Sequence, residues 1–109
     1  MDANSPGMDY LSEIGKQIDE LEKILGKYPA SAENQSLLTL HVYELLKGYR
    51  KYVDYFEALF RLPTDREQEL DQLLDILIGI EVLLEDMEYH SAELRAQIDK
   101  FADAAEPDP

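Results

Sequence analysis

The chain has 109 residues, with 24 Asp and Glu against 10 Lys and Arg, a formal net charge of -14 and no Cys. This length suits a single domain with a modest hydrophobic core. A chain without cysteine has no disulfide framework and no thiolate for a metal site or a nucleophile. The excess of acid would repel nucleic-acid phosphates and anionic lipids, which argues against direct binding to nucleic acid or to a membrane surface.

No segment has the pattern of a signal peptide or of a membrane-spanning helix. Residues 1–10 lack the basic and apolar regions of a secretory signal. The most apolar stretch, residues 73–84, is interrupted by Asp75 and Glu81 and is too short to cross a bilayer. We therefore expect a soluble, cytoplasmic protein.

Two prolines divide the chain into helical segments. Pro29 is followed by Ser31, and Pro63 is followed by Thr64, so each turn offers a residue that can cap a new helix. Glu67 lies three residues after Thr64, which completes a capping box. These signals predict helices at about residues 8–28, 32–61 and 65–104, a flexible N-terminus at 1–7 and a disordered acidic tail at 105–109.

Each predicted helix carries apolar residues at alternating spacings of three and four, which is typical of one helical face. The first stripe is Leu11, Ile14, Ile18, Leu21, Leu25 and Tyr28, and the second is Leu38, Val42, Leu45, Tyr49, Tyr52, Phe56 and Leu59. The third is Leu70, Leu73, Leu77, Ile80, Leu84, Met87, Leu94, Ile98 and Phe101, with Ser91 as its one interruption. Short loops between such helices predict an all-α, antiparallel up-down-up three-helix bundle with coiled-coil-like seams.

The three predicted helices differ in length, at about 31, 45 and 60 Å. A first helix that starts near Met8 and folds back at Pro29 reaches only the level of Lys51, so the hairpin of the second and third helices projects beyond it. The projecting tip is rich in apolar and aromatic residues, namely Tyr52, Val53, Tyr55, Phe56, Leu59, Phe60, Leu70, Leu73 and Leu74. A contiguous apolar patch is rarely left in water. We expect a homodimer in which two tips complete a four-helix bundle; a heterologous helix or residues 1–7 are the other candidates to cover the tip.

A fold about Pro63 places residues of the second and third helices at one height when their numbers sum to about 127. This rule puts Gly48 level with Gly79, where two glycines would let the backbones approach, although coincidence is the alternative. It also puts His41 beside Glu85 and Asp86.

Acidic residues concentrate in the last helix. From residue 64 onward the chain has 14 acidic residues and three basic ones. Six carboxylates lie opposite the predicted apolar seam: Glu67, Asp71, Asp75, Glu85, Asp86 and Glu93. Two interpretations are open. The carboxylates form a solvated face that keeps the protein soluble, or they form a docking face for a basic protein. In the second case their spacing could imitate that of DNA phosphates.

The residues that carry chemistry in helical bundles are few. Neither His41 nor His90 has Glu three residues before it, as a di-iron bundle requires, and two histidines are too few for a structural zinc site. A metal-dependent all-helical nucleotide pyrophosphohydrolase remains an alternative, with candidate carboxylates at Asp54, Glu57, Asp71, Asp75, Glu85 and Glu88. Asp54 and Asp71 point away from their seams, however, which disfavours it. We expect no catalytic residues, cofactor or metal, and favour a non-enzymatic interaction module: an adaptor, chaperone or inhibitor.

Overall fold

The computed structural model describes residues 6–105 and confirms the all-α architecture. Helix α1 spans Pro6–Leu25, α2 spans Ala32–Leu59 and α3 spans Arg66–Ala105. The predicted N-terminal segment and acidic tail lie largely outside the described residues, except that α1 already includes residues 6 and 7 and α3 includes residue 105.

The turn between α1 and α2 is fixed by two polar side chains. Ser31 is the N-cap of α2 as predicted, and its hydroxyl accepts a hydrogen bond of 3.0 Å from the backbone N–H of Asn34. The Nε2 of Gln35 lies 3.0 Å from the carbonyl oxygen of Leu25 and 3.2 Å from that of Ala30, so this amide satisfies carbonyls at the end of α1 and in the turn.

The predicted start of α3 is wrong by one residue. The carbonyl of Asp65 accepts the first helical hydrogen bond, from the N–H of Glu69 at 2.8 Å, and α3 begins at Arg66. The N-cap position therefore falls on Asp65 and not on Thr64, which removes Thr64 and Glu67 from the spacing of a capping box.

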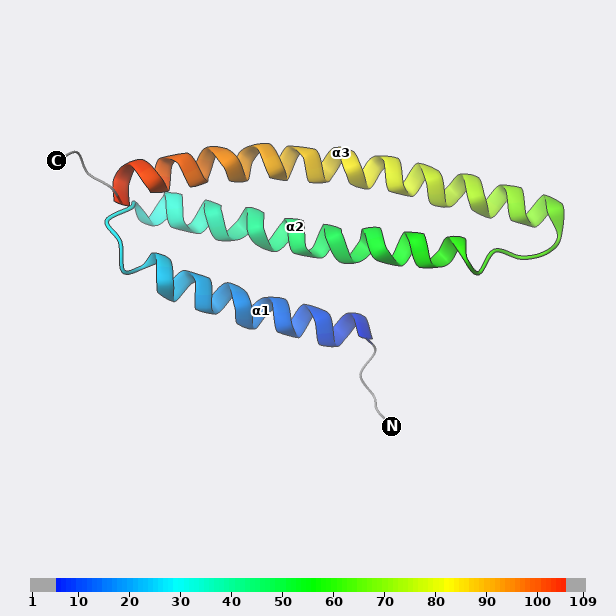
Figure 1. Ribbon diagram of the computed structural model, residues 1–109, viewed down its shortest axis with the longest axis horizontal. Helices are drawn as coiled ribbons and strands as arrows, with labels where there is room; N and C mark the ends of the chain where they lie inside the picture. Colours follow the sequence, from blue (N-terminus) through cyan, green and yellow to red (C-terminus); the bar gives the residue numbers. More distant parts are fainter. Residues whose placement is uncertain (1–5, 106–109) are drawn as a thin grey trace.

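The three antiparallel helices form an open, thin layer (Figure 1). Helix α2 lies in the middle and packs against both neighbours, whereas α1 and α3 do not pack against each other within the described residues. The molecule measures 66 × 35 × 18 Å, and the shortest dimension is less than two helix diameters of about 10–12 Å. The three helices therefore share no closed central core.

Helix α1 covers only the first part of α2. At its N-terminal end the hydroxyl of Tyr10 donates a 3.2 Å hydrogen bond to the carbonyl of Leu46, and the Tyr10 ring lies under the guanidinium of Arg50. Ile14 is the most deeply buried large side chain, at 1% exposure. Beyond this level the α2–α3 hairpin projects alone, as the helix lengths predicted (Figure 1).

The register of α2 against α3 differs from the prediction. Opposing pairs along the contact are Asn34 with Gln97 and His41 with His90, whose residue numbers sum to 131 and not to 127. Gly48 faces Leu83 and Met87. The prediction that the two glycines are level with each other is therefore wrong, because the chain runs on past the end of α2 through residues 60–65 and α3 begins beyond that end (Figure 1).

The contact between α2 and α3 is a heptad seam, but on α3 it uses only part of the predicted stripe, together with a neighbouring line that includes Leu83 and Gln97. On α2 it includes Asn34, His41, Gly48 and Tyr55, which are spaced seven residues apart. On α3 the buried line includes Ile80, Leu83 and Gln97, whereas four residues of the predicted stripe are about half exposed: Leu70, Leu77, Leu84 and Ile98. The prediction placed the whole stripe in the seam of the three-helix bundle. In an open layer α3 has one neighbouring helix, and the contact shifts to the flank that faces α2.

Candidate protein-binding surfaces

The predicted interface at the hairpin tip divides into exposed and half-buried residues. Four of its nine side chains are exposed: Phe56, Phe60, Leu70 and Leu74. The other five are half-buried, namely Tyr52, Val53, Tyr55, Leu59 and Leu73. Phe60 is 87% exposed at the start of the turn, so the tip presents an uncovered aromatic ring at its end.

The ring of Tyr55 packs against a glycine of the facing helix, Gly79. Its ring atoms lie only 2.7–2.8 Å from where a Cβ of Gly79 would be. Gly79 therefore allows the tyrosine ring to lie directly on the backbone of α3. Tyr55 packs within the hairpin and is not available to a partner in the way an exposed residue is.

One side of the projecting hairpin is an apolar surface, which we call the open face. It consists of Tyr49 and Phe56 on α2 and of Leu70, Leu77 and Leu84 on α3, all exposed. The two α2 residues and the three α3 residues are each spaced by seven, so each set follows one line along its helix. The opposite side of the hairpin has a groove lined by Lys51, Tyr55, Gly79, Val82, Leu83 and Asp86. By helical geometry the open-face residues lie on the other flank of both helices, and hence on one common side.

Sequence reasoning did not assign Tyr49, Leu77 and Leu84 to the interface, because it placed all three inside the bundle. The signal for their exposure was present: α3 also carries Ile76 and Leu83, which continue a second apolar line beside the first. A helix with two adjacent apolar lines has more apolar surface than one neighbour can cover.

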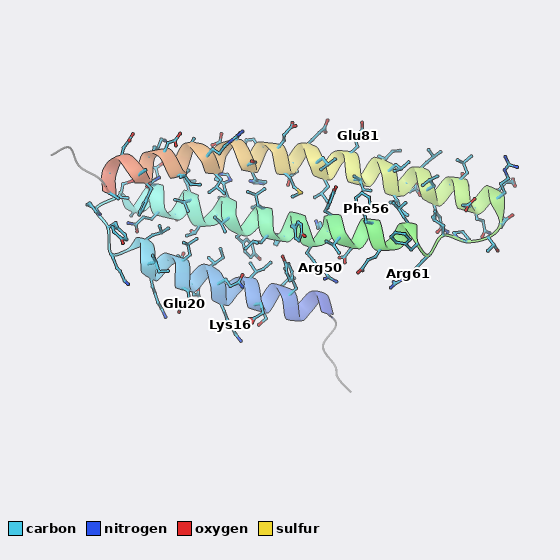
Figure 2. The ribbon with its side chains drawn as sticks, viewed as in Figure 1. Lys16, Glu20, Arg50, Phe56, Arg61 and Glu81 are labelled. Atoms are coloured by element: carbon cyan, nitrogen blue, oxygen red, sulfur yellow. The ribbon has the colours of Figure 1, made fainter. Side chains whose placement is uncertain are left out.

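The predicted acidic face is exposed over most of its length. Glu67, Asp71, Asp75, Glu85 and Asp86 are exposed, and Glu93 is half-buried. Figure 2 shows the neighbouring carboxylate Glu81 projecting from α3 away from α2. Between residues 67 and 94 the helix has nine acidic residues and no Lys or Arg, so no basic side chain of α3 offsets this charge there.

The acidic face also contains apolar residues. Leu74, which was predicted as part of the tip, and Ile78, Val82 and Tyr89, which were not assigned to a surface, are 48%, 57%, 59% and 57% exposed. Spacings of four, four and seven place them along one oblique line of α3. We call this line the outer row. Leu74 and Ile78 lie on the side away from α2. Val82 also lines the groove that α3 shares with α2, and the ring of Tyr89 lies 6.2 Å from that of His41 on α2.

A pair of histidines occupies the α2–α3 seam at the level covered by α1. The Nδ1 atoms of His41 and His90 are 2.9 Å apart, and His41 is buried at 5% exposure. The Nε2 of His90 lies 3.6 Å from a carboxylate oxygen of Asp86. His41 therefore faces the imidazole of His90, which in turn lies near Asp86, whereas the height rule placed His41 beside Glu85 and Asp86.

A second polar pair lies one heptad farther along the seam. The Nδ2 of Asn34 donates hydrogen bonds of 2.9 Å to both the backbone carbonyl and the side-chain Oε1 of Gln97. Both residues are buried. Polar pairs in a helical seam penalise shifted registers, because a shift leaves each buried group without a partner.

The carboxylates of the enzymatic alternative do not converge. Asp54 forms an exposed ion pair of 3.1 Å with Arg50 on its own helix, and Asp71 and Asp75 are exposed on the outer side of α3. Within residues 6–105 no group of three or more His, Cys, Asp and Glu side chains is placed to hold a metal ion. The described helices include none with the length and apolar character needed to cross a bilayer.

Comparisons with known protein families, with curated proteins and with solved structures found no match to this chain.

Proposed function

We propose that this chain is a non-enzymatic protein-interaction module that forms a homodimer through the open face of its hairpin tip. The observation that supports this proposal is the exposure of Tyr49, Phe56, Leu70, Leu77 and Leu84 on one side of the α2–α3 hairpin. A second copy placed antiparallel to the first would contribute two more helices and enclose these residues in a four-helix bundle.

The accessible area supports a partner of this size. The chain exposes 7954 Å², against about 6,200 Å² expected for a compact monomer of its mass. The difference exceeds the roughly 800 Å² that each partner contributes to a standard stable interface. A dimer through the open face would cover part of this excess.

The acidic side of α3 is a separate surface and supports the second half of the proposal, docking of a basic protein. Glu81 points away from α2 (Figure 2), and Asp71, Asp75 and Glu85 are exposed. Adaptors, chaperones, inhibitors and imitators of DNA all fit a module with these two surfaces.

Size-exclusion chromatography with light scattering tests the dimer. The wild-type chain is expected at twice its 12.5 kDa mass. Leu77→Asp places a charge in the open face and is expected to shift the protein to the monomer mass, because burial of an unpaired carboxylate is costly.

The matched control is Ile78→Asp, which introduces the same charge one residue along α3 but on the outer row. Both side chains are exposed, at 46% and 57%, so both variants should keep their helical circular dichroism. The dimer proposal is wrong if the wild type is monomeric at high concentration, or if the two variants change the mass equally.

A further inference from the structure

The outer row of α3 combines apolar and acidic residues in an alternating arrangement. Leu74, Ile78 and Val82 are successive i, i+4 neighbours and are about half exposed or more. Exposed carboxylates flank them, at Asp71 and Asp75 before and at Glu81, Glu85 and Asp86 after. A face that only keeps a protein soluble has no need of an apolar line along its centre.

We propose that the outer row binds a cationic amphipathic helix of another protein, with its apolar stripe on Leu74, Ile78 and Val82 and its Lys or Arg residues beside the flanking carboxylates. This inference gives a partner class to the docking face of the proposed function and rests on it. It does not depend on the dimer, which uses the other side of the hairpin.

Charge selects this occupant over a second copy of the chain. Another copy carries a net charge of -14, and its own α3 would bring nine more carboxylates and no Lys or Arg between residues 67 and 94. Like charges across a contact disfavour binding, whereas a basic helix gives ion pairs on both flanks of the row.

The apolar line also separates this occupant from a DNA-binding domain that mistakes α3 for DNA. Such a domain contacts phosphates with Lys and Arg and gains little from exposed Ile or Val at the centre of the surface. A partner helix with apolar residues at spacings of three and four matches the line. The partner is therefore expected to bind through apolar contacts as well as ion pairs.

The experiment measures binding of a synthetic peptide of Leu and Lys in amphipathic helical order to the full chain, by isothermal titration calorimetry. A peptide of the same composition in scrambled order is the comparison. The amphipathic peptide is expected to bind at least about tenfold more tightly than the scrambled one, a factor equal to 1.4 kcal/mol.

The protein variant for this test is the double substitution Ile78→Ser with Val82→Ser. Both side chains are exposed, and Ser has a helix propensity close to that of Ile and Val, so the helix should stay folded. Binding of the amphipathic peptide is expected to weaken at least about tenfold. Ile98→Ser, which removes an exposed apolar side chain of α3 outside the row, should leave binding unchanged.

Three results would overturn the proposal: no binding of the amphipathic peptide, equal binding of the scrambled peptide, or full binding by the Ile78→Ser, Val82→Ser protein. Equal binding of the scrambled peptide, or full binding by the Ile78→Ser, Val82→Ser protein, would indicate that charge alone attracts the peptide, as expected for a DNA mimic. The dependence on salt distinguishes peptide binding from dimerisation. A rise in ionic strength should weaken peptide binding but strengthen association of two chains that each carry -14.

Discussion

Gly79 and Tyr55 provide a direct test of the α2–α3 packing. A Cβ at Gly79 would lie 2.7 Å from Cζ and Oη of the tyrosine and 2.8 Å from Cε1, whereas a Cβ at Gly15 meets no atom within 4 Å. The substitution Gly79→Ala therefore adds a methyl group to a filled contact, and Gly15→Ala adds one to open space.

The expected sizes follow from two opposing effects. Alanine is favoured over glycine in a helix interior by about 1 kcal/mol, and overpacking of a close contact costs about 1–3 kcal/mol. Gly15→Ala should raise the free energy of unfolding by roughly 0.5–1 kcal/mol. Gly79→Ala should lower the free energy of unfolding by up to about 2 kcal/mol, because the cost of displacing the Tyr55 ring exceeds the gain in helix propensity.

Urea unfolding monitored by circular dichroism measures both substitutions, at one fixed protein concentration because dimerisation would contribute to stability. The decisive comparison repeats Gly79→Ala in a Tyr55→Leu background, where the ring that meets the new methyl is gone. There Gly79→Ala should become stabilising, with a coupling of at least about 1 kcal/mol between the two sites. If Gly79→Ala has the same effect in both backgrounds, the ring does not lie on α3 and the register is incorrect.

Two further predictions concern polar groups of α2. Ser31→Ala removes the N-cap hydrogen bond from the N–H of Asn34 and should lower the free energy of unfolding by about 1 kcal/mol, measured by thermal or urea unfolding. The control Ser12→Ala, at an exposed position within α1, should not lower it. Equal effects of the two substitutions would contradict the role of Ser31 as a cap. Asn34→Leu leaves the buried side chain of Gln97 without its partner and should destabilise by about 1–3 kcal/mol, while addition of Gln97→Leu should recover part of the loss. A double variant less stable than Asn34→Leu would show that the side chains of Asn34 and Gln97 are not coupled in stability.

Much of the fold follows from local signals in the sequence. The spacing of apolar residues predicts three helices, and Pro29 with Ser31 predicts where α2 begins, because a cap and a proline act within a few residues of their position. The helix lengths also predict that the hairpin projects beyond α1. The error at the start of α3 is of the same local kind, since Thr64 and Asp65 are both good caps and the backbone uses the second.

The candidate surfaces were predicted only in part. Phe56, Phe60, Leu70 and Leu74 are exposed at the tip as expected, and the acidic face is exposed along most of α3. The open-face residues Leu77 and Leu84 and the outer-row residues Ile78 and Val82 were not assigned to a surface. Whether they are exposed depends on the number of neighbours that α3 has, which no local pattern specifies.

The sequence by itself determined the number of helices, their order, their bounds to within one to three residues and the concentration of negative charge on the last one, because these properties depend on neighbouring residues along the chain. The tertiary structure decided which of the two apolar lines of α3 packs against α2. Both lines repeat every seven residues and fit a helical seam, so periodicity does not distinguish them. The position of α1 on the far side of α2 leaves α3 with one neighbouring helix, so the second apolar line stays unburied.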